Sequence, residues 1–114
     1  SYWDSTNHRY TPGVAGWYLF GGVVRIATSA AGDGSANNLM SLSLYKNGSH
    51  YIRSQLQFSS DVIINGSYAL PTAMIQLNGS SDYVEVYISS EEALVVSDHA
   101  AVPSEFWGML VQAT

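Results

Sequence analysis

The segment from Trp17 to Ile26 is apolar on both of the faces that a β-strand would present. Successive side chains of a strand point to opposite sides. One side carries Tyr18, Phe20, Val24 and Ile26, and the other carries Trp17, Leu19 and Val23 before Arg25. A domain of 114 residues has a single hydrophobic core, which covers one face of such a strand. We therefore expect another molecule, in the simplest case a second copy of the chain, to cover the other face.

The composition favours association of this kind and excludes several other partners. Charged residues make up 11% of the chain, against about a quarter in average proteins, so the surface is poorly protected against association. The net charge is -5 and Lys46 is the single lysine, so the clustered cations that bind nucleic acid are missing. No apolar run approaches the roughly 20 residues that span a bilayer. We expect neither nucleic-acid binding nor membrane insertion.

The residue types that commonly carry catalysis or bind metals form no recognisable arrangement. Cysteine is absent, which excludes disulfides, thiolate catalysis and cysteine-bound zinc. His8, His50 and His99 show no paired spacing, and the chain has no Gly-x-Ser-x-Gly nucleophile motif. The polar segment 33–38 lacks the alternating oxygen ligands of a helix-loop-helix calcium site. We predict a protein that is not an enzyme and has no catalytic residues and no assigned metal or cofactor.

Alternation of apolar and polar residues with a period of two dominates the chain, which predicts an all-β fold. Residues 40–46 and 51–58 alternate on either side of Asn47-Gly48, a dipeptide typical of tight hairpin turns. Residues 83–88 alternate as well. Short strands divided by turn residues predict a two-sheet antiparallel sandwich of the jelly-roll kind, which forms a single domain over residues 1–114.

Three Asn-Gly-Ser tripeptides, at 47–49, 65–67 and 78–80, match the acceptor pattern for N-glycosylation. Each also falls where the pattern of strands requires a turn, and the backbone preferences of Asn-Gly favour the turn interpretation. Residues 69–77 are predicted to form a strand that Pro71 interrupts, as at a sheet edge or a bulge.

The apolar pattern sorts the predicted strands into two sheets. Strands 40–46, 51–58 and 83–88 are apolar on one side only, which is typical of a sheet that faces water. Strands 17–26 and 106–111 are apolar on both sides, and we expect them to be neighbours in an inner sheet. We predict that partner subunits contact the second face of the inner sheet, at Trp17, Leu19, Val23, Arg25, Trp107, Met109 and Val111.

Four short motifs occur in series along the chain. They are Pro-x-x-x-Gly-x-Tyr-x-Phe at 12–20, Leu-x-x-Asn-Gly at 44–48, Leu-x-Gly followed by Asp-x-Val at 77–84, and Ser-x-Phe-x-Gly-x-Leu at 104–110. In this order and spacing they resemble the globular heads of complement component one-q and its relatives. The resemblance covers nearly the whole chain. It implies a trimeric jelly roll related to tumour necrosis factor, with the seven residues of the inner sheet's second face as the trimer interface.

This chain has no cysteine, is rich in serine, asparagine and glycine, and carries Tyr2-Trp3-Asp4 before the first motif. In these features it is most similar to the heads at the tips of bacteriophage tail fibres and tail needles. This resemblance implies a homotrimer on the virion, outside the cell, at the end of an upstream fibre shaft. It implies attachment to a bacterial surface glycan or protein. Heads of this family have a further strand before the position of Ser1, and some hold calcium near the trimer axis, for which no ligands are assigned here.

Exposed tyrosines provide flat apolar area and a polar tip, and therefore suit sugar or protein contacts. Four tyrosines are predicted on the outward faces of one-sided strands, and two asparagines belong to a polar loop. We predict receptor contacts at Tyr45, Tyr51, Tyr83, Tyr87, Asn37 and Asn38. The alternative for the tyrosines is cross-strand packing that covers the outer sheet.

Two other functions fit the same pattern. The head could be a structural cap that keeps the strands of a fibre in register, with no receptor of its own. It could instead be a secreted complement-like or cytokine-like ligand, for which a collagen-like stalk upstream would argue.

Overall fold

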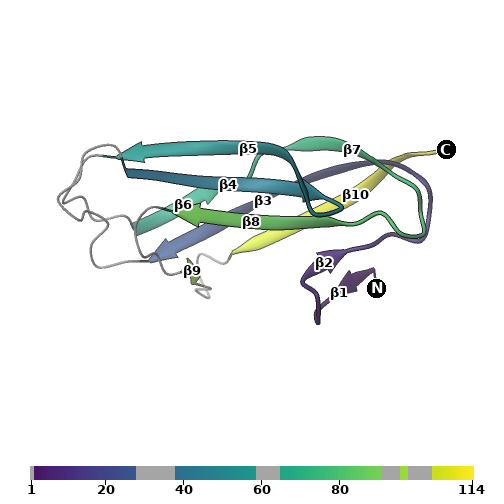
Figure 1. The fold of residues 1–114 in the computed structure, drawn as a ribbon, viewed down its shortest axis with the longest axis horizontal. Helices are drawn as coiled ribbons and strands as arrows, with labels where there is room; N and C mark the ends of the chain where they lie inside the picture. Colours follow the sequence, from purple (N-terminus) through teal and green to yellow (C-terminus); the bar gives the residue numbers. More distant parts are fainter. Residues whose placement is uncertain (1, 28–37, 59–64, 91–95, 98–103) are drawn as a thin grey trace.

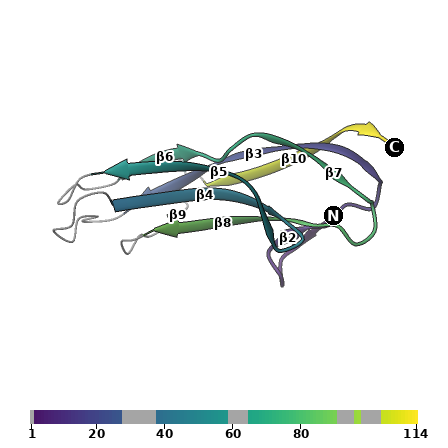
Figure 2. The same ribbon diagram turned by 45° about the horizontal axis from the view of Figure 1, so that its top comes forward.

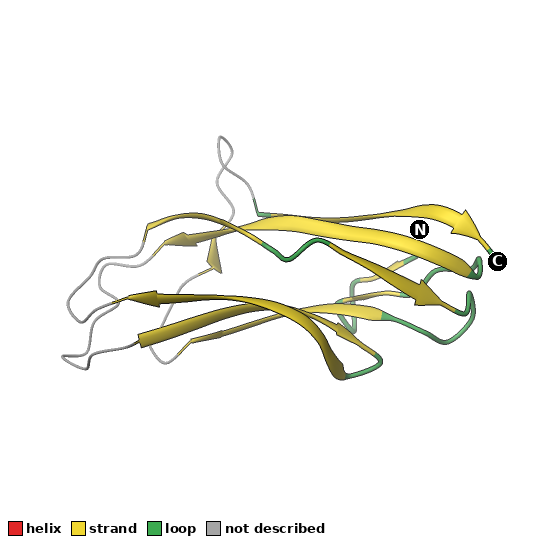
Figure 3. Cartoon of the chain, turned by 90° about the horizontal axis from the view of Figure 1, so that it is seen from above, coloured by secondary structure: helices red, strands yellow, loops and turns green. Residues whose placement is uncertain are grey.

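Two antiparallel β-sheets pack face to face in the computed structural model, and Figure 3 shows them as two layers. The structure describes residues 2–27, 38–58, 65–90, 96–97 and 104–114. These residues form ten strands and no helix, and accordingly none of them belongs to a helix that could cross a membrane. The all-β prediction, with two antiparallel sheets, is confirmed.

Sheet A contains the strands that were predicted to be apolar on one side (Figure 1). Its order is β1-β2-β8-β4-β5, with β4 at Asn38–Lys46, β5 at Ser49–Phe58 and β8 at Val84–Ser90. A short hairpin of β1 (Trp3–Asp4) and β2 (Arg9–Tyr10) extends the sheet beyond β8 and was not predicted. Strand β4 lies between β8 and β5 and therefore has a neighbour on each side.

Sheet B is built around β3 (Gly16–Ala27), the doubly apolar strand. On one side β3 pairs with β10 (Glu105–Ala113) and β9 (Val96–Ser97), and on the other with β7 (Ala73–Leu77) and β6 (Asn65–Ala69). The predicted pairing of the two doubly apolar strands is confirmed, and Figure 2 shows β3 and β10 side by side. One face of each of these two strands points toward the other sheet, and the second face lies on the outside of sheet B.

The core lies between the sheets, where side chains of both inner faces meet. Phe20 is fully buried, and its ring lies 5.6 Å from Tyr10 and 5.8 Å from Phe106, measured between centroids. Two neighbouring clusters make up this core. Their fully or almost fully buried members are Tyr18, Phe20, Val24, Ile26, Met40, Leu42, Leu44, Leu70, Ala73, Ile75, Leu77 and Val84.

The predicted hairpin of β4 and β5 turns at Asn47 and Gly48, which have φ values of 53° and 79°. Positive φ at both positions is the requirement of a type I′ turn, which Asn-Gly satisfies at low cost. The register then shifts, because Leu44 pairs with Ile52 while the next residue pairs with His50. Tyr51 is the extra residue of this β-bulge, and a bulge re-aims the side chain it carries.

Two predictions about turns need correction or refinement. Asn65 and Gly66 do not form a turn but begin β6, where they pair with β3. The strand predicted at 69–77 is broken around Pro71 into β6 and β7, as the proline indicated. Both halves pair with β3. Between them the chain leaves the ladder of backbone hydrogen bonds, at the position where proline has no N–H to donate.

The alternation of buried and exposed side chains, which the sequence predicts for these strands, fails at four positions. Alternation places Ser41 and Ser43 on the water-facing side of β4, but they are only 8% and 5% exposed, because β4 has a strand on each side and Gln55, Arg53 and Tyr87 lie beside these serines. Alternation places Leu56 and Leu110 on inward faces, but they are 37% and 43% exposed. They lie on β5 and β10, which end the two sheets and have a neighbouring strand on one side only.

Gly79 is the position where a small substitution should have the clearest local effect. Its φ is +75°, and a Cβ there would overlap the backbone of Val14 and Ala15. We expect Gly79→Ala to lower the free energy of unfolding by more than about 1 kcal/mol, measured by urea denaturation. Gly66→Ala is the matched control, because its added Cβ would lie 3.7 Å from Tyr68 Oη, an ordinary contact. Equal stabilities of the two variants would contradict the prediction.

Candidate functional site

The outer face of sheet B carries a cluster of exposed apolar side chains, which we call the apolar face. Met109 of β10, Leu19 of β3 and Met74 of β7 form one row across three strands. Trp17 and Trp107 lie on the same face of the neighbouring rows. Both tryptophans and both methionines are 36% to 55% exposed. The side chains predicted to meet a partner therefore form a continuous surface.

Glycines opposite aromatic side chains keep this surface flat. Trp107 pairs with Gly21, and a Cβ at Gly21 would lie 2.5 Å from the indole ring. On the inner face the same two strands repeat the arrangement, because Gly108 pairs with Phe20 and leaves room for its ring. An aromatic ring that lies across a glycine covers the strand beneath it. The indole of Trp107 is thus held against the sheet, with part of its surface exposed.

The other predicted interface residues lie at the border of the apolar face. Val23 and Arg25 are half-buried, and Arg25 donates from Nη1 to the Ile26 carbonyl at 3.3 Å. Val111 is the extra residue of a bulge in β10 and is 53% exposed. Met74 was not among the predicted interface residues. Every second residue of its strand, among them Ile75, is buried, and this alternation places Met74 on the outer face.

Polar side chains of sheet A cover the edge of β7. The Tyr51 hydroxyl donates to the Met74 carbonyl at 2.9 Å, and the Lys46 ammonium donates to the Gln76 carbonyl at 2.7 Å. Both carbonyls belong to sheet B, so these bonds join the two layers along one side of the sandwich. An edge whose carbonyls already accept hydrogen bonds is a poor template for an added strand.

The four predicted receptor tyrosines lie in three different environments. Tyr45 and Tyr87 stack on the outer face of sheet A, with 4.1 Å between ring centroids. Tyr83 is half-buried and lies 4.3 Å beneath the Arg9 guanidinium. Tyr51 is 44% exposed but lies at the edge described above, because the bulge turns it away from the other three. The structure brings together two of the four.

The predicted loop asparagines and calcium-like segment are largely outside the described residues. Asn37 and the rest of 33–37 are among the residues that the structure does not describe, and so is His99. The backbone of Asn38 begins β4 and pairs with Phe58. Within the described residues, no three His, Asp or Glu side chains lie close enough together to hold a metal ion.

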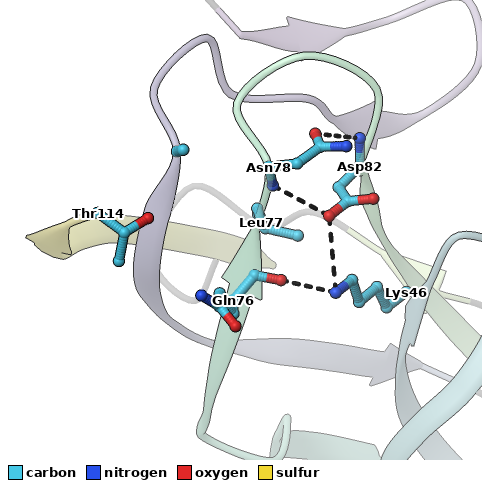
Figure 4. Close-up of a pocket in the computed structure, with 7 residues that line it drawn as sticks. Lys46, Gln76, Leu77, Asn78, Asp82 and Thr114 are labelled. Carbon is cyan, nitrogen blue, oxygen red and sulfur yellow. Dashed lines mark hydrogen bonds and ion pairs between the residues drawn. The ribbon is translucent and has the colours of Figure 1, made fainter.

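A polar network closes the end of the sandwich where β7, β8 and the β4–β5 hairpin meet (Figure 4). The Asp82 carboxylate accepts from Asn47 Nδ2 at 2.9 Å and from the Asn78 N–H at 3.0 Å, and Lys46 Nζ lies 3.6 Å from it. The Asn78 side-chain oxygen Oδ1 accepts hydrogen bonds from three backbone N–H groups of the following turn. Asn47 accepts from the Tyr83 N–H at 2.9 Å.

The hydrogen bond from Asn47 is the largest cause that holds the pKa of Asp82 below its ordinary value. Burial opposes this effect, while the Asn78 N–H and the Lys46 charge add to it. The adjoining hollow of about 230 Å³ is lined by Gln76, Leu77 and Thr114 among others. Because the carboxylate already has protein partners, this network is suited to fixing the turns rather than to proton transfer.

Comparison with known proteins adds no relative. No protein-family model matches the chain, and no curated protein matches it significantly.

Proposed function

We propose that this chain is the trimeric head of an adhesive fibre, a jelly roll without enzymatic activity that binds a glycan or protein on a bacterial surface. The apolar face of sheet B supports the trimer. The four motifs in series support the setting, which is the tip of a bacteriophage tail fibre or needle outside the cell.

The single observation that carries the proposal is the exposure of the apolar face. Two tryptophans and two methionines lie beside each other there, with Leu19 between them. Full burial of such a side chain contributes about 1.5–3 kcal/mol. Because these side chains are partly exposed, association would gain part of that free energy for each of them. Beyond Trp107, the next row of this face holds Glu105 and the row after it holds Arg25. These two residues give the apolar centre a charged border, as in subunit interfaces.

A trimer that covers sheet B leaves the outer face of sheet A to meet a target. Three copies on one fibre tip let weak individual contacts add up to firm attachment. The proposed division assigns assembly to one sheet and recognition to the other.

Acidic substitutions on the apolar face test the assembly. We expect Leu19→Asp combined with Met109→Asp to convert a trimer into monomers in sedimentation equilibrium at micromolar concentration, because two carboxylates would lose their hydration in the interface. His50→Asp on the outer face of sheet A is the control and should stay trimeric. A wild-type chain that is a stable, folded monomer at this concentration would contradict the proposal.

Adsorption to bacteria tests recognition separately. The purified head should bind host cells and compete with the intact particle. Deletion of the head would abolish fibre assembly if it were a structural cap, whereas a recognition head with altered surface tyrosines should assemble normally and lose adsorption. Failure of a trimeric head to bind any host cell would contradict the adhesive role.

A further inference from the structure

The outer face of sheet A has a narrow trough along its central strand β4. Ser43 lies between Tyr87 of β8 and Arg53 of β5, and Ser41 lies between Ser89 and Gln55 in the next row. The two serines of the middle strand lie among the larger side chains of Arg53, Gln55 and Tyr87, and this arrangement produces the depression. Its open part has a volume of about 260 Å³ and is lined by Leu39, Ser41, Gln55, Ser89 and Ser90.

An aromatic platform stands at one end of this trough. The rings of Tyr45 and Tyr87 stack at 26° to each other, and His50 packs edge-on against Tyr45 at 5.8 Å. Tyr87 remains 46% exposed. Tyr87 is one row along β4 from Ser41, a distance of about 7 Å, and Tyr45 is one row further. A ligand the size of one or two sugar rings would therefore reach both the platform and the open trough.

Two serine hydroxyls of β4, those of Ser41 and Ser43, are weakly bonded or not bonded to the described part of the protein. Gln55 Nε2 donates to Ser41 Oγ over 3.3 Å, which is longer than an optimal hydrogen bond. The Ser43 side chain is 5% exposed, and its hydroxyl makes no hydrogen bond to any residue that the structure describes. A buried hydroxyl without a partner is costly, and such groups commonly bond to a ligand or an ordered water.

We propose that this trough binds a sugar ring of a surface glycan, an inference that rests on the adhesive function proposed above and names its ligand and site. The exposed face of Tyr87 would stack on the apolar C–H face of the ring. Ser41, Gln55 and Ser89 would exchange hydrogen bonds with its hydroxyl groups. The combination of an aromatic surface with a few polar groups is what orients a small ligand in a pocket.

The charges around the trough favour a sugar over a nucleic acid. Among the described residues that line the trough or flank Ser43, Arg53 is the one cation, whereas phosphate backbones are held by several. Most of the exposed apolar side chains other than tyrosine, which a protein partner would bury, lie on sheet B, namely Trp17, Met74, Trp107, Met109, Leu110 and Val111, against Trp3 and Leu56 on sheet A.

Amide chemical-shift mapping on the full chain tests this site. The probes are the methyl glycosides of glucose, galactose, mannose and N-acetylglucosamine at millimolar concentration. At least one should shift the amides of Ser41, Gln55 and Tyr87. We expect Tyr87→Ser and Ser41→Leu, which remove the platform and fill the trough, to weaken that binding by about tenfold or more.

Tyr83→Ser is the matched control, because it removes a tyrosine of the same sheet that packs under Arg9 instead. It should leave sugar binding unchanged. Absence of shifts with every probe, shifts confined to residues elsewhere, or equal losses in Tyr83→Ser and Tyr87→Ser would each overturn the site. Light scattering on the same samples keeps the two proposals apart, since a monomer that binds sugar would refute only the trimer.

Discussion

Replacement of Phe20 by alanine should lower the free energy of unfolding by about 3–5 kcal/mol, the range for removal of a buried phenylalanine. Phe20 has no exposed surface and contacts three other rings, those of Tyr10, Tyr18 and Phe106. Its ring also lies against Gly108, so the cavity would extend between two strands of sheet B and the opposite sheet. Urea denaturation followed by tryptophan fluorescence measures the change.

The comparison requires equal protein concentrations, because the stability of an oligomer depends on concentration. Phe20→Leu is the matched control. It keeps most of the buried apolar volume and should cost markedly less than Phe20→Ala. Similar losses in the two variants would show that the ring contacts, rather than the buried apolar volume, account for the stability that Phe20 provides. A loss below about 1 kcal/mol in Phe20→Ala would contradict the core that we describe.

Local patterns were sufficient to predict the hairpin and the division of strands between sheets. Asn47-Gly48 has few conformational alternatives, and the alternation around it leaves one register that buries Leu42 and Leu44. The doubly apolar strands were recognisable because polar residues are missing from both faces. These are properties of neighbouring residues, and such properties can be read along the chain.

Features that depend on residues distant in sequence were not predictable in the same way. The burial of Ser41 and Ser43 depends on which side chains β5 and β8 place beside them. The short β1–β2 hairpin has too few residues for a periodic pattern, although Asp4 accepts the N–H groups of Thr6 and Asn7 in its turn.

The candidate site shows the same limit. Alternation alone places Tyr51 with the other outward tyrosines, but one extra residue in the bulge moves it to the edge, where it bonds to sheet B. The Tyr45 and Tyr87 stack joins strands separated by a long stretch of chain. The sequence therefore indicates which residues are exposed tyrosines. Which of these tyrosines lie together depends on the register of three strands.

Replacement of Asp82 by alanine should destabilise the end of the sandwich by about 1–3 kcal/mol, the range for loss of hydrogen bonds to a charged group. The carboxylate joins the hairpin, through Asn47 and Lys46, to the turn that begins at Asn78. Its side chain is 18% exposed, so water replaces only part of what is lost. Thermal and urea denaturation at neutral pH measure the difference.

The same substitution should flatten the dependence of stability on pH in the acid range. The pKa of Asp82 is lowered in the folded state, chiefly by the Asn47 hydrogen bond, so its contribution is fully present above the unfolded pKa of about 3.9. That contribution is lost as the pH falls through the lower, folded value. Asp4→Ala is the control, because the pKa of Asp4 is also lowered, first by its bond from Asn7, but its carboxylate lies in an exposed turn. Asp82→Ala should therefore remove more of the acid sensitivity of the wild type than Asp4→Ala does, and the reverse order would show that the network is not what holds the two layers together at this end.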